Sequence, residues 1–199
     1  MTTVQSHKTP VVAGQPDVTI SHDQNTVHPA VRYVWGGLRI VMGVTFLWAF
    51  LDKLLALGYS TGVDSTTGAV DRFGPAAWIH GGSPTDGFLA FGAKGPFEGF
   101  YHAIAGTAFA DTMFMAALLG LGVAFLSGTF MRIATVAGAL LYLMMWSVVL
   151  PTANNPLFDD HTIGFFVVIL LGLYGTGRYL GLGNWWAKQT IVQRFPILK

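Results

Sequence analysis

Apolar residues gather into four long runs along the chain, separated by one long connecting segment and two short ones. The runs lie at about 31–57, 111–128, 132–150 and 160–180, and each is near the ~20 residues that an α-helix needs to cross a bilayer. The pattern predicts an all-α fold: a polytopic membrane protein whose domain, residues 31–181, is a four-transmembrane-helix bundle with a long helical loop at 59–110. Residues 1–30 are polar and are expected to form a disordered tail, and residues 182–199 form a C-terminal segment.

Small residues recur at helical spacing in the last three runs, a pattern that lets the backbones of membrane helices approach closely. The positions are Ala116, Gly120, Ala124 and Gly128, then Ala134 and Gly138, and finally Gly164 and Gly172. Because the links between these runs are short, we expect the three helices to lie antiparallel beside one another.

One face of the first predicted helix carries its small residues and its cations, and is expected to turn toward the other helices rather than toward lipid. This face comprises Arg32, Gly36, Arg39, Gly43, Phe46, Phe50 and Lys53. Arg39 lies about 10 Å from Arg32 along the axis, inside the hydrocarbon, where an ionisable group is a functional hypothesis by default. The alternative is that its guanidinium extends to the interface or binds helix carbonyls. Asp52 and Lys53 point in different directions, so each needs a partner elsewhere or open water.

The segment at 59–110 carries signals of two short helices. The run from Ser83 to Asp86 has the pattern of a capping box with proline at the first helical position, and an apolar stretch follows at 87–91. A second, amphipathic helix is predicted at 97–104. A long connection with helices of its own is more often a lid or binding element than a linker. Its chemically useful residues, each alone more often an interface anchor or a solvated group, are Trp78, His80, Glu98 and His102.

The link at 150–161 places two prolines, two asparagines, two aspartates and a histidine between hydrophobic walls. Proline cannot continue a helix, and Asn155 followed by Pro156 favours a turn, so an ordered link is predicted. Asp159 and Asp160 come where the next helix needs caps for its free N–H groups. Besides this capping role for Asp160, the link can form a polar site at the mouth of the bundle, with His161 as its most reactive member.

Composition strengthens the membrane assignment and excludes several kinds of site. The 199 residues are 52% hydrophobic and only 11% charged, whereas soluble domains are near 25% charged. Without any cysteine, the chain forms no disulfide, holds no cysteine-ligated iron–sulfur cluster and has no thiol nucleophile. A net charge of +1 without a basic tract argues against nucleic-acid binding. No metal site is predicted either, since the histidines of the N-terminal tail are scattered.

Orientation follows from the distribution of lysine and arginine, which favour cytoplasmic segments of membrane proteins. With four crossings, one side holds Lys8, Arg32, Arg132, Arg178, Lys188, Arg194 and Lys199. The other side holds Arg72 and Lys94 against Asp64, Asp71, Asp86, Glu98, Asp159 and Asp160. We therefore expect a multi-pass protein of the plasma membrane with both termini cytoplasmic. His80, His102 and His161 then lie on the outer face of the membrane, together with the outer end of the first helix.

The ordered set of these motifs resembles the DoxX/DoxD family of four-helix membrane proteins over about residues 32–180. Arg39 with Gly43, then Asp52 and Lys53, is similar to the opening helix of that family. The stretches at 78–88 and 154–161 are similar to a DoxD-type loop and to the link before the last helix. The family includes the membrane subunit of thiosulfate:quinone oxidoreductase, and many members have no assigned activity. The resemblance implies the fold, and it places polar family positions at Arg39, Lys53 and residues 159–161.

Two functions from different classes fit this sequence. The first is an integral membrane subunit of a quinone-linked oxidoreductase, with a small sulfur anion such as thiosulfate as the candidate electron donor. Quinone would then be a diffusible co-substrate, because the chain supplies no evident redox cofactor of its own. The alternative is a non-catalytic accessory subunit that anchors partner subunits through its small-residue seams. Haem held by His102 and His161 is a third, weaker hypothesis.

For the first function we expect polar residues to converge at the outer mouth of the bundle. The candidate catalytic residues are Lys53, Asp160 and His161. The candidate substrate- or quinone-binding residues are Arg39, Asp52, His80, His102 and Asn155. His161 would be kept neutral by the helix N-terminus and so could exchange a proton or hydrogen-bond with a quinone. The expected partners are the lipid bilayer and other protein subunits, with self-association into a homo-oligomer left open.

Overall fold

The computed structural model describes residues 28–153 and 155–199, and this part of the chain is helical, without a strand. The all-α fold class is thus confirmed, while all but the last three residues of the expected N-terminal tail lie outside the described residues. The four longest helices are α1 (Pro29–Leu55), α4 (Ala108–Ser127), α5 (Met131–Val148) and α6 (Asp160–Leu173). They begin and end within a few residues of the predicted runs, except at the end of α6.

Three of these helices, α1, α4 and α5, are long and apolar enough to cross a membrane. The fourth, α6, has only 14 residues, which at 1.5 Å per residue is about 21 Å against a hydrocarbon core of about 30 Å. The prediction that this helix continues to residue 180 is wrong. The chain turns at Gly175, whose φ of +60° is left-handed, and enters a short 3-10 helix, η3 (Thr176–Arg178).

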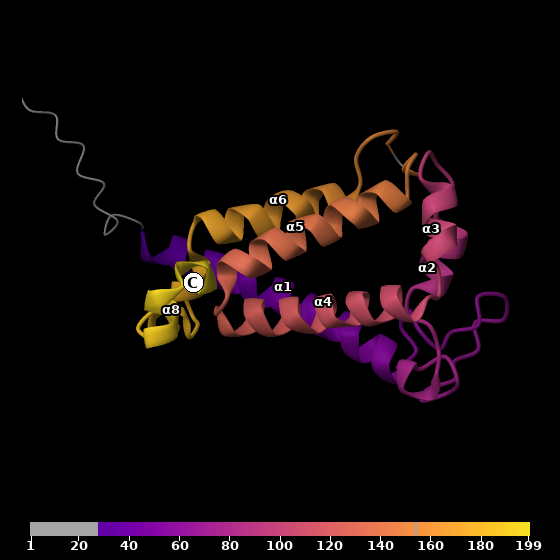
Figure 1. The fold of residues 1–199 in the computed structure, drawn as a ribbon, viewed down its shortest axis with the longest axis horizontal. Coiled ribbons are helices and arrows are strands. Elements are labelled where there is room, and N and C mark those ends of the chain that lie inside the picture. Colours follow the sequence, from indigo (N-terminus) through magenta and orange to yellow (C-terminus); the bar gives the residue numbers. More distant parts are fainter. Residues whose placement is uncertain (1–27, 154) are drawn as a thin grey trace, which may run out of the picture.

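The long helices pack as two pairs, α1 along α4 and α5 along α6 (Figure 1). Glycine permits the close approach of the first pair: a Cβ atom at Gly43 would lie 2.6 Å from the backbone nitrogen of Leu126. From the α4 side, a Cβ atom at Gly122 would lie 2.9 Å from the backbone nitrogen of Leu47. The predicted small-residue seam is therefore only partly right, because a Cβ atom at Gly120 would meet nothing within 4 Å.

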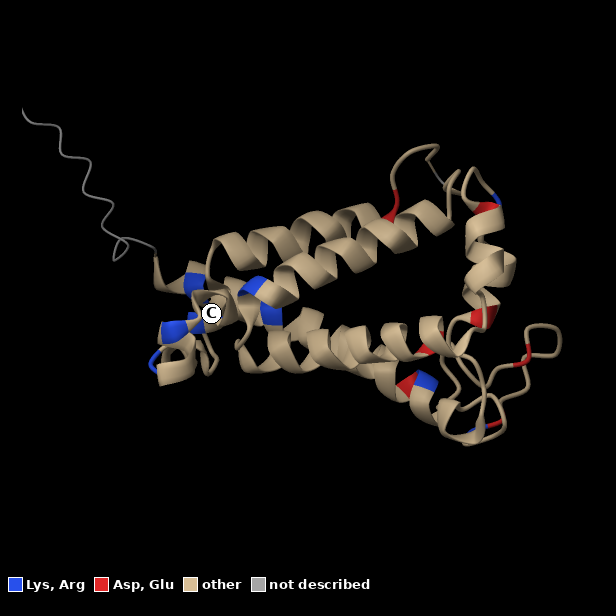
Figure 2. Ribbon diagram, in the orientation of Figure 1, with Lys and Arg blue, Asp and Glu red and all other residues tan. Residues whose placement is uncertain are grey.

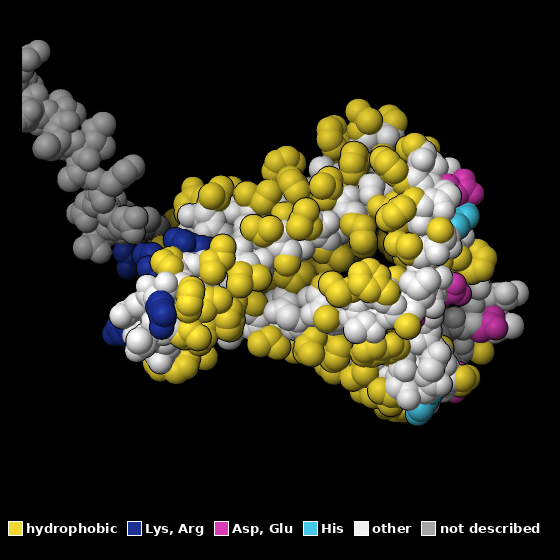
Figure 3. Space-filling model, in the orientation of Figure 1, with side chains coloured by type: hydrophobic (Ala, Val, Ile, Leu, Met, Phe, Trp, Pro, Cys, Tyr) yellow, Lys and Arg dark blue, Asp and Glu magenta, His cyan; other side chains and the backbone are white. Residues whose placement is uncertain are grey.

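The core lies where the two pairs meet. Its buried members include Phe46 of α1, Met115 and Phe125 of α4, and Val168 and Leu171 of α6. The buried residues of α1 within the bilayer belong to the face predicted from helical spacing. Other apolar side chains cover the outside of the bundle between its two ends, as lipid contact requires (Figure 3). The protein is accordingly a helical membrane protein.

At one end α4 and α5 diverge, and two short helices lie across the opening (Figure 1). These are α2 (Asp86–Gly92) and α3 (Glu98–Ile104), close to the two predicted loop helices. They pack on the end of α5 through a small apolar cluster, and the Tyr101 hydroxyl lies 2.5 Å from the Ser147 hydroxyl. The predicted capping box is altered: Ser83 accepts a hydrogen bond from the backbone of Asp86, while Thr85 at the cap position makes no capping bond.

The opposite end is formed by η3 and by the C-terminal helices α7 (Gly183–Trp186), α8 (Thr190–Arg194) and η4 (Pro196–Leu198). Among the described residues, most lysines and arginines gather at this end, whereas the aspartates and the glutamate of the same residues lie toward the α2–α3 end (Figure 2). The charge separation read from the sequence is therefore also a separation in space along the bundle.

Candidate functional site

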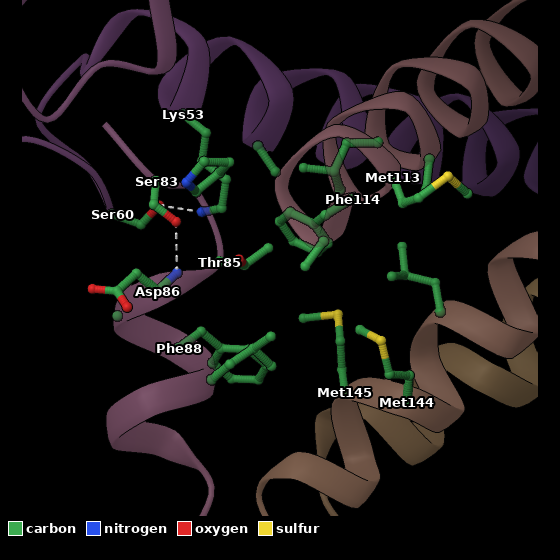
Figure 4. A pocket seen from close by; sticks show the side chains of 18 of the residues that line it. Lys53, Ser60, Ser83, Thr85, Asp86, Phe88, Met113, Phe114, Met144 and Met145 are labelled. Carbon is green, nitrogen blue, oxygen red and sulfur yellow. Dashed lines mark hydrogen bonds between the residues drawn. The ribbon is translucent and has the colours of Figure 1, made fainter. Parts of the chain in front are cut away.

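A cavity of about 1200 Å³ lies between the two helix pairs at the end covered by α2 and α3. Its walls are mostly apolar and come from all four long helices and the long loop. Figure 4 shows Phe88 of α2, Met113 and Phe114 of α4, and Met144 and Met145 of α5 around this space. Ligand sites of proteins commonly measure 300–1000 Å³, so the cavity has room for a sizeable apolar molecule. Three of the wall residues are thus methionines, whose unbranched side chains adapt to irregular apolar ligands.

Lys53 enters the cavity from α1 and is oriented by the start of the long loop. Its Nζ donates a hydrogen bond to the Ser60 hydroxyl at 3.2 Å, and that hydroxyl donates to Oδ2 of Asp52 at 2.7 Å (Figure 4 shows Lys53 beside Ser60). The carboxylate also accepts bonds from the backbone nitrogens of Tyr59 and Ser60. As predicted, the neighbours on the helix find partners elsewhere. An ammonium group has three N–H donors, so two remain for a ligand as far as the described residues go.

Asp52 itself is not a wall of the cavity. Its side chain is only 1% exposed, and its hydrogen bonds hold the loop that positions Ser60 and Lys53. The expectation that Asp52 binds a substrate or a quinone is therefore corrected to a supporting role. Its buried carboxylate is satisfied by three donors, which is what burial of a charge requires.

The link before α6 contributes the other polar wall of the cavity through Asp160 and His161. Asp159, rather than Asp160, caps the helix: its Oδ1 accepts from the backbone nitrogens of His161 and Thr162, at 3.1 and 3.2 Å. The Thr162 hydroxyl bonds back to Asp159 and completes a capping box. The predicted cap thus lies one residue earlier, which leaves the exposed Asp160 carboxylate free to face the cavity.

The imidazole of His161 is fixed by the same aspartate. Its Nδ1 lies 2.5 Å from Oδ2 of Asp159. A neutral imidazole that donates its Nδ1 proton to a carboxylate keeps an acceptor lone pair on Nε2. His161 is thus prepared to accept a hydrogen bond or a proton from a ligand through Nε2, and the Tyr142 ring lies beside it with 6.5 Å between centroids.

This capping aspartate gives the fold a pH dependence. Burial raises the pKa of Asp159, but hydrogen bonds from His161 and Thr162 outweigh it and hold the pKa below its usual value. A carboxyl of this kind stabilises the fold above its unfolded pKa of about 3.9, and that contribution is lost as the pH falls through the lower folded value.

Replacement of Asp159 by alanine is expected to lower the free energy of unfolding by about 1 kcal/mol near pH 7, the usual cost of a lost N-cap. The cost should diminish in acid, at pH values below the unfolded pKa of about 3.9, as the parent's own carboxylate becomes protonated. Thermal unfolding of parent and variant in detergent at both pH values measures the difference. An equal cost at the two pH values would contradict a role for the ionised carboxylate.

Three other predicted residues lie outside the cavity. Oδ1 of Asn155 accepts from the backbone nitrogens of Leu157 and Phe158 and closes a local turn. His80 is exposed, with Nδ1 3.1 Å from the carbonyl of Gly74. His102 lies on the exposed side of α3, 3.9 Å from Glu98 in a weak pair. None of the three belongs to the walls, so their predicted ligand-binding roles are not supported, and His102 lies outside the cavity that His161 lines.

Arg39 is far from this site, at the end where α4 finishes. Its side chain is fully buried, and its guanidinium donates to four backbone carbonyls, those of Phe125, Leu126, Tyr179 and Leu180. The last carbonyls of a helix have no partner within it, and the guanidinium supplies the missing donors. The structure thus shows the carbonyl-binding alternative, and it places Arg39, expected to bind a substrate or a quinone, outside the walls of the cavity.

Sequence reasoning missed Asp111, which joins the long loop to the first turn of α4. Its side chain is only 7% exposed, and Oδ1 accepts from the Ser83 hydroxyl, the Thr85 hydroxyl and the Thr85 backbone nitrogen, at 2.8, 2.6 and 3.1 Å. The available signal was an aspartate at the start of an apolar helix together with a Ser-Pro-Thr turn. The three residues fix the loop segment that leads into α2, and Ser83 and Thr85 line the cavity.

Comparison of the chain with protein-family models, with curated proteins and with solved structures gave no match. The similarity to the DoxX/DoxD family accordingly rests on the motifs alone. The chemistry of the site must therefore be argued from its own geometry.

Proposed function

We propose that this chain is an integral membrane subunit of a quinone-linked oxidoreductase, and that the cavity is its quinone site. The observation that supports this most is the combination of a large apolar cavity with Lys53, Asp160 and His161 among its walls. A quinone has matching parts, a ring with two polar carbonyl oxygens and a hydrocarbon tail. These three are also the predicted catalytic residues, and all of them line this one cavity.

The polar walls match the chemistry of quinone reduction, in which two electrons and two protons convert each carbonyl into a hydroxyl. The Lys53 ammonium can donate a hydrogen bond to one carbonyl oxygen and stabilise the negative charge that develops there. His161 can exchange a proton with the other oxygen through Nε2, since Asp159 occupies Nδ1. Asp160 provides a second group for protons near the exposed end of the cavity.

Electrons come from a donor that a partner subunit handles, because the sequence contains no cysteine for a cluster or a thiol. The DoxX/DoxD resemblance suggests a small sulfur anion. Two thiosulfate ions lose two electrons when they join as tetrathionate, which balances the reduction of one quinone with two protons. We include the thiosulfate:quinone reaction in the proposal on this resemblance alone.

Binding of a decyl-tailed benzoquinone to the purified chain in nanodiscs tests the site directly. Lys53→Met should weaken binding about tenfold or more, since a hydrogen bond to a charged group contributes about 1.5–3 kcal/mol. His161→Gln should weaken it about fivefold, as expected for a neutral hydrogen bond of about 1 kcal/mol. The matched control is His80→Gln, an exposed histidine outside the cavity, which should bind like the parent. Parental binding by both site variants, with folding verified by thermal unfolding, would remove the site.

The same proposal includes an orientation in the plasma membrane with both termini cytoplasmic. It is supported by the gathering of lysine and arginine at the C-terminal end (Figure 2) and by the packing of α6 along α5, which allows a fourth, short crossing. Because the chain has no cysteine of its own, labelling of a single introduced cysteine shows directly on which side of the membrane that position lies. An impermeant thiol reagent added to intact cells should label Ser65→Cys and leave Gln193→Cys unlabelled. The reverse labelling would overturn the orientation.

The second candidate is a non-catalytic accessory subunit. It is favoured because two polar residues of the cavity already have structural hydrogen bonds. The imidazole of His161 is bound to the capping aspartate, and Lys53 is bound to the loop. Under this hypothesis, partner subunits co-purify from native membranes while quinone binding is absent. The quinone titration therefore separates the two functions.

A further inference from the structure

A second cavity, of about 370 Å³, follows the seam between α4 and α5 away from the first one. All of its walls are apolar, and most are small. They are Ala116, Ala117, Gly120, Leu121, Val123, Ala124, Phe130, Ile133, Ala134 and Ala137. Val123 and Ile133 are 52% and 43% exposed, so this groove opens on the lipid-facing side of the bundle.

The groove adjoins the candidate quinone site. Ala117 belongs to the walls of both cavities, and α4 and α5 contribute to both. Only three residues further along α4, a Cβ atom at Gly120 would meet nothing within 4 Å. The two spaces thus share this alanine as a common wall, and both lie between α4 and α5.

We propose that this groove holds the hydrocarbon tail of the ligand whose ring occupies the larger cavity, so that the ligand passes sideways between α4 and α5 from the bilayer. This inference rests on the proposed quinone function and extends it, because it assigns a tail-binding subsite and requires a lipid-soluble ligand. A free, water-soluble quinone would have no use for the groove.

Size and chemistry favour a hydrocarbon chain as the occupant. A cavity of about 150 Å³ holds one benzene, so this groove accommodates roughly two and a half such groups. It runs along α4 from Ala116 to Ala124, about 12 Å at 1.5 Å per residue. A helix of a second copy has a diameter of about 10–12 Å. It is too wide for the narrow cross-section that a volume of about 370 Å³ leaves over this length. The absence of any polar wall residue excludes a headgroup, which would lose its hydrogen bonds with water there.

The test compares a tail-free benzoquinone with its decyl-tailed analogue, titrated against the purified chain in nanodiscs. Gly120→Leu narrows the groove beyond the shared alanine, and it should weaken binding of the tailed quinone about tenfold while leaving the tail-free quinone unchanged, because Gly120 is a wall of the groove alone. Ala116→Phe, at another position that lines the groove alone, should give a smaller loss, again only for the tailed quinone. The matched control is Leu119→Phe on the same helix, which lines neither cavity and is 40% exposed. Thermal unfolding verifies that each variant folds.

The outcomes separate this inference from the function on which it rests. If the parent binds neither quinone, the proposed function fails. If both quinones bind and Gly120→Leu and Ala116→Phe weaken them equally or not at all, the function stands and the tail subsite is wrong. The latter result would also follow if bulk lipid or a second copy of the chain covered the groove, and it would overturn the proposal.

Discussion

Replacement of Arg39 by leucine is expected to lower the free energy of unfolding by about 3 kcal/mol or more, the typical cost of breaking a buried charged network from one side. The guanidinium is fully buried and bonds carbonyls of two segments that are distant in sequence, the end of α4 and the chain after η3. Leucine leaves four carbonyls without these donors, at about 1–3 kcal/mol for each that water cannot reach. The decrease in the free energy of unfolding therefore measures how much this one side chain contributes to holding the two segments together.

Chemical or thermal unfolding in detergent measures this effect, with Val41→Leu as the matched control. Val41 is on the same helix and is 59% exposed, so an apolar exchange there should change stability little. Arg39→Lys should recover only part of the loss, because a single ammonium cannot span four carbonyls as the planar guanidinium does. Parental stability in Arg39→Leu would mean that the arginine extends to the interface instead.

Replacement of Asp111 by alanine is expected to free the segment that leads into α2, at a cost of about 2–4 kcal/mol. One carboxylate oxygen accepts three hydrogen bonds from Ser83 and Thr85, and bonds to a charged group each contribute about 1.5–3 kcal/mol, with some compensation by water. Because α2 forms one wall of the cavity, its release should also speed quinone dissociation.

Hydrogen exchange of the amides at 85–92 gives the local measurement. Their protection should fall in Asp111→Ala, while the amides of α6 keep theirs. Glu98→Ala is the matched control, since that carboxylate is 52% exposed on α3 and makes only a weak pair. Asp111→Asn retains an acceptor oxygen and should lie between parent and alanine. Unchanged exchange in the alanine variant would show that the three hydrogen bonds do not hold the loop.

Much of the fold follows from local patterns in the chain. Apolar runs of sufficient length located the four long helices, and helical spacing identified the buried face of α1 around Gly36, Arg39 and Gly43. The end of α6 did not follow, because Tyr179 and Leu180 extend the apolar run although Gly175 already has a left-handed backbone. Hydropathy cannot detect such a turn, whereas the density of glycine there could have indicated it.

The candidate site was predictable only where the helix ends determine depth. The C-terminal end of α1 and the start of α6 lie on the same side of the bundle. This placement brings Lys53, Asp160 and His161 to one cavity, as expected. The partners of Arg39 and Asp111 could not be predicted, since they are backbone carbonyls and loop hydroxyls that tertiary packing brings near. The sequence correctly singled out Arg39 as a charged residue within the predicted membrane span, but the hydrogen bonds of Arg39 are structural.

The most direct measurement of the central claim is photolabelling of the purified chain by an azido-quinone, with the labelled peptides identified by mass spectrometry. The account predicts labelling of the cavity walls around Met113 to Ala117 and Met144 to Met145, abolished by excess unlabelled quinone and reduced in Lys53→Met. Labelling confined to lipid-facing positions such as Val136 and Leu140, and unaffected by competitor, would contradict a quinone site in this cavity.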